Sequence, residues 1–143
     1  MIMNIKIENR DLFTVPQGYY LAHCISADFA LGAGIAKVFD EVYNMRFKLF
    51  REYDMFKYDG GDALLIDNTF NLVTKPKCYH KPTYDSLREA LVEMREQMEM
   101  LSVTKLAMPK IGCGLDRLDW TRVYDIICEV FENTEVEILI CEI

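Results

Sequence analysis

The feature that most constrains the fold of this chain is a regular alternation between short apolar segments and longer amphipathic ones. The short segments are rich in β-branched and aromatic residues and are bounded by turn-forming residues, a pattern typical of strands. The longer segments repeat apolar residues every three or four positions, which is typical of helices that bury one face. The pattern predicts strands at residues 2–7, 19–25, 63–66, 70–74, 106–108 and 136–141, and helices at residues 35–50, 83–101 and 119–131.

This order of elements predicts an α/β fold, with a mixed central sheet of about six strands and helices packed on both faces. A short Asp67-Asn68-Thr69 link separates the strands at residues 63–66 and 70–74, so we expect an antiparallel pair. The apolar spacing over residues 35–50 is compatible with one bent helix or with two. The chain has no internal repeats, and its length is close to the ~150 residues of one domain, so residues 1–143 are expected to form a single domain.

Composition and charge exclude several classes of protein. Sixteen basic against 23 acidic residues give a net charge of −7, which is unsuited to binding a long nucleic-acid duplex. The longest uncharged stretch, residues 12–27, contains polar residues and is shorter than the ~20 residues that span a bilayer, so no membrane segment is expected. The N-terminus lacks the pattern of a signal peptide. Five cysteines without a Cys-x-x-Cys pair indicate free thiols in a reducing compartment, so we expect a cytoplasmic protein.

Two glycine-bearing loops follow predicted strands and lead into predicted helices: residues 32–36 (GAGIA) and residues 112–116 (GCGLD). Glycine lets the backbone approach an anion closely, and the helix behind such a loop adds a favourable dipole, so the two loops together are suited to holding a diphosphate. Each loop alone is equally compatible with a tight turn. Neither has the sequence of a P-loop or of a dinucleotide-binding Rossmann unit, which argues against kinases and dehydrogenases.

Beyond the loops themselves, the sequence resembles one known family. Residues 21–28 (LAHCISAD), the first glycine loop and residues 108–118 (MPKIGCGLDRL) together resemble the macrodomain family. The second loop is specific to its terminal ADP-ribose protein glycohydrolase branch. The resemblance extends from Asp11 through His80 and Lys81 to the C-terminus. It implies a three-layer α/β/α sandwich, the macrodomain fold, that binds ADP-ribose with the diphosphate held by the two glycine loops, and we expect a monomer.

The resemblance also implies roles for individual residues. Asp11 corresponds to an acidic residue that accepts a hydrogen bond from the adenine amino group, and Leu12 follows it at the adenine. Lys75 and Asp116 correspond to the catalytic pair of the branch. In that pair the lysine amine engages the anomeric carbon of the distal ribose, and the aspartate transfers protons and resolves the adduct. The other residues expected to contact the ligand are Ser26, Gly32, Ala33, Gly34, Ile35, Ala36, Pro109, Ile111, Gly112, Cys113, Gly114, Leu115 and Ile143.

The residue types are compatible with this chemistry. A lysine attacks a sugar carbon only as the neutral amine, which a desolvated site at the end of a buried strand, as expected for Lys75, would supply. A carboxylate near the same carbon, as expected for Asp116, can act as general base and then as general acid. The resemblance therefore predicts a hydrolase that removes mono-ADP-ribose from acidic side chains or deacylates O-acyl-ADP-ribose. The alternatives are the same chemistry on ADP-ribosylated nucleic acid, as in antitoxin macrodomains, and a non-catalytic reader or sponge of ADP-ribose.

Other reactive side chains give weaker signals. Cys113, between two glycines at a helix entrance, has the setting of an activated thiol, but no histidine is expected beside it. Cys78 and His80 supply at most two metal ligands, so we predict no metal, and no cofactor either. The chain lacks the asparagine and the glycine run of macrodomains that use an ordered water, which disfavours that mechanism. Arg10 stands where the family often has glycine.

Overall fold

The computed structural model describes residues 4–143, so the first two residues of the strand predicted at residues 2–7 lie outside the described range. Within residues 4–143, no helix is long and apolar enough to cross a lipid bilayer. The strands are β1 (Asn4–Asn9), β2 (Tyr20–Ser26), β3 (Asp62–Ile66), β4 (Thr69–Lys75), β5 (Lys105–Met108) and β6 (Glu137–Glu142). The helices are η1 (Leu12–Thr14, a 3-10 turn), α1 (Gly34–Tyr43), α2 (Met45–Glu52), α3 (Tyr84–Leu101) and α4 (Trp120–Val130).

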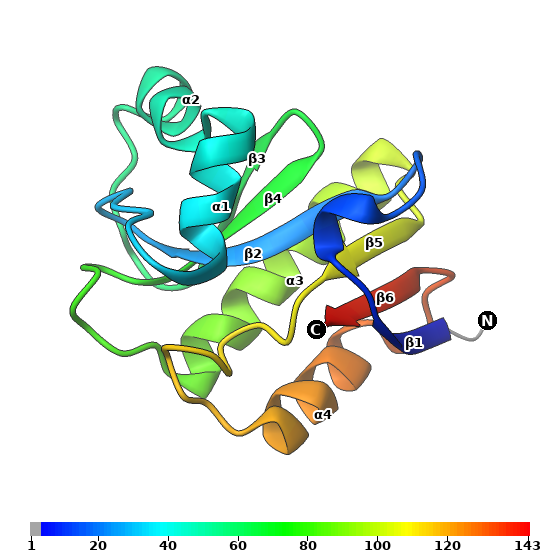
Figure 1. The fold of residues 1–143 in the computed structure, drawn as a ribbon. Helices are drawn as coiled ribbons and strands as arrows, with labels where there is room; N and C mark the ends of the chain where they lie inside the picture. The colour runs from blue at the N-terminus through cyan, green and yellow to red at the C-terminus, as the bar shows by residue number, and fades with distance from the viewer. Residues whose placement is uncertain (1–3) are drawn as a thin grey trace.

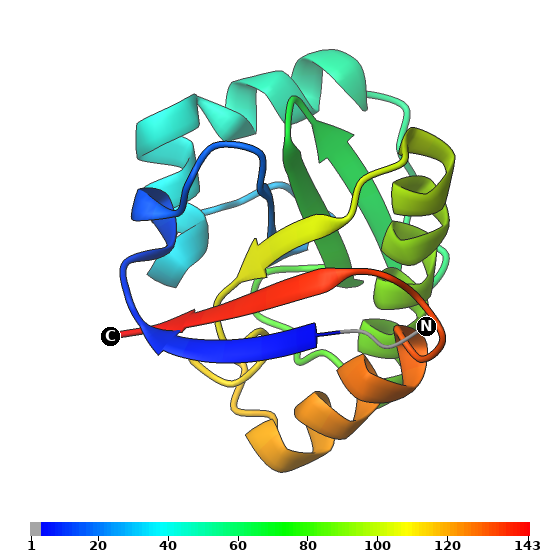
Figure 2. The same cartoon turned by 90° about the vertical axis from the view of Figure 1, so that its right-hand side faces the viewer.

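The six strands form one mixed sheet in the order β1-β6-β5-β2-β4-β3. Neighbouring strands run parallel, except that β3 and β4 form the antiparallel pair expected from their short link. Helices α1 and α2 pack on one face of the sheet, and α3 and α4 pack on the other (Figures 1 and 2). The predicted three-layer α/β/α sandwich is therefore confirmed.

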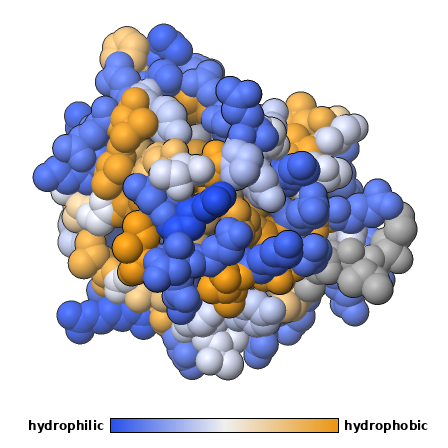
Figure 3. Space-filling model, turned by 45° about the vertical axis from the view of Figure 1, so that its right-hand side comes forward, coloured by the Kyte–Doolittle hydropathy of each residue, from blue (hydrophilic) through white to orange (hydrophobic). Residues whose placement is uncertain are grey.

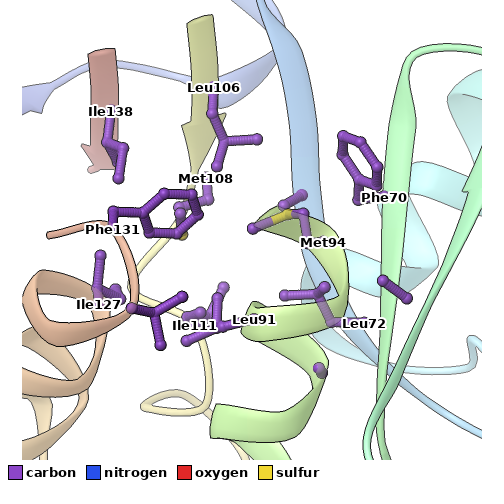
Figure 4. Close-up of a cluster of buried hydrophobic side chains, with 14 of the residues drawn as sticks. Phe70, Leu72, Leu91, Met94, Leu106, Met108, Ile111, Ile127, Phe131 and Ile138 are labelled. Atoms are coloured by element: carbon purple, nitrogen blue, oxygen red, sulfur yellow. The ribbon is translucent and has the colours of Figure 1, made fainter. Parts of the chain in front are cut away.

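The sheet buries a separate apolar core on each of its faces. The core under α3 and α4 contains Phe70, Leu91, Met94 and Phe131, all fully buried, and Figure 4 shows these side chains between the helices and the strands. Because both faces are covered, β4 is buried along its length up to Lys75, its last residue. On the face of the molecule that Figure 3 shows, apolar residues at the surface are interspersed with hydrophilic ones.

Local sequence explains where the helices begin and end. The segment predicted as one bent helix or two forms two helices, because Asn44 adopts a left-handed conformation (φ 55°) that ends α1. Thr83 and Ser86 form a capping box at the start of α3, and the Asp119 side chain caps α4. A Cβ on Gly61 would overlap the carbonyl oxygen of Ser86, so glycine at this position allows α3 to pack closely against the sheet.

Candidate functional site

The strand order places the carboxyl ends of five parallel strands along one edge of the sheet. Across that edge lie Asp11 after β1, Ile143 after β6, Pro109 after β5, Ser26 at the end of β2 and Lys75 at the end of β4. Four strand spacings of about 4.8 Å make this row about 19 Å long. Figure 1 shows the connections that follow β2, β4 and β5 gathered on the same side of the molecule. Ligands of such sheets bind beyond the carboxyl ends of the strands, so this edge is the candidate site.

A cleft of about 610 Å³ opens along part of this edge. Both glycine loops and the ends of β2 and β4 line it, so folding brings together loops that lie far apart in the sequence. Contacts between these residues and a ligand stay a prediction. The predicted site residues that line the cleft are Ser26, Gly32, Ala33, Gly34, Ile35, Ala36, Lys75, Pro109, Ile111, Gly112, Gly114, Leu115 and Asp116.

The backbone of the two loops requires glycine at two positions. Gly34 and Gly112 have φ angles of 58° and 73°, in the left-handed region that favours glycine. A Cβ on Gly112 would also lie 2.9 Å from Cδ1 of Leu118, whereas a Cβ on Gly114 would meet nothing within 4 Å. A Cβ on Gly34 would lie 3.4 Å from Cδ1 of Leu115, so the second loop reaches across to the first. The shape of the cleft is therefore set by loop backbone as much as by side chains.

Lys75 and Asp116 meet in the cleft at the end of β4. The Nζ of Lys75 donates a 2.7 Å hydrogen bond to Oδ1 of Asp116, and the two side chains are only 14% and 17% exposed. The backbone N–H of Ala27 donates a 2.9 Å hydrogen bond to the carbonyl of Lys75, which fixes the strand end beside β2. The pair is thus a short, largely desolvated contact between an amine and a carboxylate that are 41 residues apart in the sequence. Such a pair can exchange a proton directly.

The cleft does not contain Asp11 and Leu12, which are predicted to lie at the adenine, or Ile143, which is predicted to contact the ligand. Asp11 is exposed, and its Oδ1 accepts a 3.0 Å hydrogen bond from the backbone N–H of Phe13 at the start of η1. Ile143 is 93% exposed, and Leu12 is buried in the core beneath α1 and α2. This end of the row is therefore an open surface. The roles predicted for Asp11, Leu12 and Ile143 stay predictions.

The thiols nearest the pair do not have the properties of nucleophiles. Burial, with the charge of Asp119 acting in the same direction, raises the pKa of Cys113 to about 11. Burial likewise raises the pKa of Cys24, which lines the cleft, to about 12, and the charge of Asp116 adds to that effect. Cys113 packs against the core under α3 and α4 rather than lining the cleft. Both thiols are protonated at neutral pH, which argues against thiolate catalysis.

Sequence reasoning missed the segment between β4 and α3 as part of the cleft. Cys78, Tyr79, His80 and Lys81 all line it. The resemblance included His80 and Lys81, but no spacing rule tells which loop side chains turn toward a cleft. In the part of the chain described, no group of three or more His, Cys, Asp or Glu side chains is placed to hold a metal ion.

Asp28 was also missed, and it fixes this segment against the end of β2. Its Oδ2 accepts a 3.0 Å hydrogen bond from the backbone N–H of Cys78. Its Oδ1 accepts hydrogen bonds from Oγ of Ser26 (2.5 Å) and from the N–H of Ala30 (3.2 Å). Burial acts to raise the pKa of Asp28, but these hydrogen bonds outweigh burial and hold the pKa below its usual value. The ionised carboxylate therefore joins two walls of the cleft.

Comparison with known proteins places this chain in a family. It is 43% identical to the ADP-ribose glycohydrolase OARD1 of Bos taurus and 41% identical to that of Homo sapiens, each over 133 residues that cover 91% of this chain and 86% of the relative. The solved macrodomain of Mycobacterium tuberculosis DarG shares the fold, with a TM-score of 0.87 and 19% identity over 97% of both chains. No protein-family model matches the chain. On the strength of these relatives and this shared fold, the chain belongs to the macrodomain family, in its ADP-ribose glycohydrolase branch.

Proposed function

We propose that the chain is a hydrolase that releases ADP-ribose from a carboxylate ester, either a mono-ADP-ribosylated acidic side chain or O-acyl-ADP-ribose. The observation that carries the proposal is the 2.7 Å ion pair between Lys75 and Asp116 in a cleft lined by two glycine loops. The glycohydrolase activity for which the two OARD1 relatives are named supports the same class of reaction.

In this proposal ADP-ribose lies along the edge of the sheet. The adenine occupies the open end beside Asp11, the diphosphate meets the two glycine loops, and the distal ribose lies beside Lys75. The loop backbone approaches the phosphates closely, and the N-terminus of α1, which begins at Gly34, adds a favourable dipole. The row of strand ends from β1 to β4 thus has the same order as the parts of the ligand.

The ion pair supplies the groups that ester cleavage needs. A proton passes from Nζ of Lys75 to Oδ1 of Asp116, which leaves a neutral amine. The amine nitrogen bonds to the anomeric carbon of the distal ribose as the bond from that carbon to the ester oxygen breaks, and Asp116 returns its proton to the leaving carboxylate. Asp116 then takes a proton from water, the hydroxide adds to the same carbon, and the carbon–nitrogen bond breaks. Release of ADP-ribose and return of the proton to Nζ restore the pair.

Turnover on three substrates tests the proposal: mono-ADP-ribose linked to glutamate, to serine and to thymidine. We expect release of ADP-ribose from the glutamate ester. Release from the thymidine-linked substrate alone would instead support the nucleic-acid alternative. Tight binding of ADP-ribose without turnover of any of the three substrates would support the alternative of a non-catalytic ADP-ribose reader.

Chemical trapping tests the role of the pair. If the ribose of the adduct opens to an imine, cyanoborohydride will fix a mass increment on a peptide containing Lys75. The Asp116→Ala variant is expected to form the adduct more slowly, because Lys75 loses its proton acceptor. The adduct should nevertheless accumulate even without reductant, because the group that delivers water is gone. A mass increment on a different lysine would contradict the covalent mechanism. The absence of any increment on a protein that still releases ADP-ribose would contradict it as well.

Three expectations about the protein as a whole belong to this proposed function. All five cysteines are free thiols, which supports action in a reducing compartment such as the cytoplasm. We further propose that the chain acts as a monomer, without binding long duplex nucleic acid, in line with its net charge of −7. Sedimentation analysis with and without a duplex would test both points.

A further inference from the structure

Residues 76–81, in the connection between β4 and α3, take no part in the chemistry of the ion pair. This segment, hereafter the strap, has the sequence PKCYHK, with two lysines, a histidine and no acidic residue, in a chain whose net charge is −7. It follows Lys75 directly, and four of its residues line the cleft. The strap therefore adds local positive charge to the rim of the cleft beside the reacting pair.

The strap is tied to both neighbouring walls of the cleft. The backbone N–H of Cys78 donates a 3.0 Å hydrogen bond to the carboxylate of Asp28. The Nζ of Lys81 donates a 3.2 Å hydrogen bond to the carbonyl of Leu115 in the second glycine loop. A segment restrained at two points presents its remaining side chains with less loss of conformational entropy when a partner binds.

The side chains that the strap presents to solvent are suited to an anionic partner. Tyr79 is 77% exposed, and its ring meets the His80 ring edge-on with 4.7 Å between centroids. Lys77 is exposed as well. An exposed tyrosine beside cationic groups is typical of binding surfaces, because tyrosine adds contact area and a hydroxyl donor at a small entropic cost.

The position of the strap decides which part of a substrate it can contact. In the proposed function ADP-ribose occupies the edge from β1 to Lys75, and the distal ribose is its last group. The strap begins one residue further along the chain, at Pro76, and forms the rim at that end. What extends from the anomeric carbon toward that rim is the leaving group.

We propose that the strap recognises the polypeptide that carries the ester and selects segments in which further carboxylates flank the modified side chain. This inference rests on the proposed function. The lysine ammonium groups and the tyrosine hydroxyl of the strap can each donate a hydrogen bond to an individual carboxylate of such a segment. The net negative charge of the whole chain also disfavours binding of nucleic acid, which carries one negative charge per nucleotide.

The test compares substrates that share ADP-ribose and differ in leaving group. They are O-acetyl-ADP-ribose, a glutamate-linked mono-ADP-ribosyl peptide with flanking aspartates, the same peptide with flanking asparagines, and a thymidine-linked mono-ADP-ribosyl oligonucleotide. The wild-type chain is compared with the double variant Lys77→Glu/Tyr79→Ala. The matched control is Lys105→Glu, an exposed lysine at the start of β5 and hence at the opposite edge of the sheet.

In the wild-type chain we expect kcat/KM for the aspartate-flanked peptide to exceed that for the asparagine-flanked peptide, and the ratio to shrink as salt is raised. In the double variant, the ratio of kcat/KM for the aspartate-flanked peptide to that for O-acetyl-ADP-ribose is expected to fall about tenfold. The control should keep the wild-type ratio.

Each other result has a distinct meaning. The wild-type chain and the double variant could have the same ratio of kcat/KM for the aspartate-flanked peptide to that for O-acetyl-ADP-ribose. If the wild-type chain turns over both of these substrates, that result overturns the strap proposal and leaves the proposed function intact. A double variant that loses turnover only on the oligonucleotide shows that the strap reads nucleic acid, which also overturns it. Absence of wild-type turnover on every ester overturns the proposed function itself.

Discussion

The two ends of the candidate site differ in enclosure. At the β4 end, Lys75 and Asp116 are mostly buried and in direct contact, with the strap and a glycine loop beside them. At the β1 end, Asp11 and Ile143 lie on open surface outside the cleft. A largely desolvated pair can transfer protons without competition from bulk water, whereas an open surface can only add contacts. On the proposed function, we therefore expect the chemistry to occur at the β4 end and the β1 end to contribute affinity alone.

Replacing Lys75 tests this division most strongly. In Lys75→Ala we expect kcat on the glutamate ester to fall by at least about 10³-fold, or about 4 kcal/mol, because the attacking amine is lost. The Kd for ADP-ribose should stay within about tenfold of wild type. Kinetics and calorimetry on the same preparation measure both quantities.

Lys75→Arg serves as the matched control, since it keeps the positive charge beside Asp116 but offers a poor nucleophile. It should be as inactive as Lys75→Ala. Full activity in either variant would exclude Lys75 as the nucleophile and support a water mechanism based on Asp116.

Lowering the pH tests whether activity at the enclosed end is lost because the Lys75–Asp116 pair changes or because the protein unfolds. The Nε2–H of His23, on β2, donates a 2.6 Å hydrogen bond to Oδ1 of Asn71, and the His23 ring stacks on Phe39. Burial lowers the pKa of His23 to about 4, with the Asn71 hydrogen bond acting in the opposite direction. Unfolded, the ring titrates near 6.5, so between these values the unfolded chain binds a proton that the folded chain does not. Stability is therefore complete above pH 6.5 and falls by about 3 kcal/mol as the pH approaches 4.

Urea unfolding at several pH values measures this loss. His23→Gln should remove most of the decrease in the free energy of unfolding between pH 6.5 and 5. His80→Gln, at an exposed position, should retain that decrease. Equal slopes in the two variants would show that another group causes the acid sensitivity. Binding and turnover should decline together wherever unfolding is the cause.

Gly112 and Gly114 of the second glycine loop should respond differently to substitution by alanine. Gly112→Ala is expected to lower the free energy of unfolding by about 2 kcal/mol, because the residue needs a positive φ and its Cβ would crowd Leu118. Gly114→Ala has open space and should change stability by less than about 0.5 kcal/mol. If the loop meets the diphosphate, Gly114→Ala will still weaken ADP-ribose binding. Unchanged affinity would place the phosphates elsewhere.

The smallest effect is expected at the open end. Asp11→Ala should weaken binding of ADP-ribose and of AMP by the same factor, about three- to tenfold, because both carry the adenine. Asp11→Asn should stay close to wild type, since its amide oxygen still accepts hydrogen bonds. Calorimetry measures the affinities. A fall in kcat with unchanged affinity would contradict the assignment of this end to binding alone.

The sequence was a sufficient guide to several parts of the site. Glycine at positions 34 and 112 follows from backbone demands that are local, and both have the positive φ that such loops require. The strand end at Lys75 and the cap at Asp119 follow from local patterns as well. Tyr79 and Asp28 were missed because their roles depend on contacts between segments that periodicity does not describe.

By itself, the sequence determined which segments form strands and helices, because apolar spacing and capping residues act over a few neighbouring positions. It also determined, through resemblance, which family's residues are present. Only the tertiary structure decided the order β1-β6-β5-β2-β4-β3, which lines up five strand ends and places Lys75 2.7 Å from Asp116. Strand order and the course of the strap depend on packing between distant segments, and many such packings are compatible with the same local pattern.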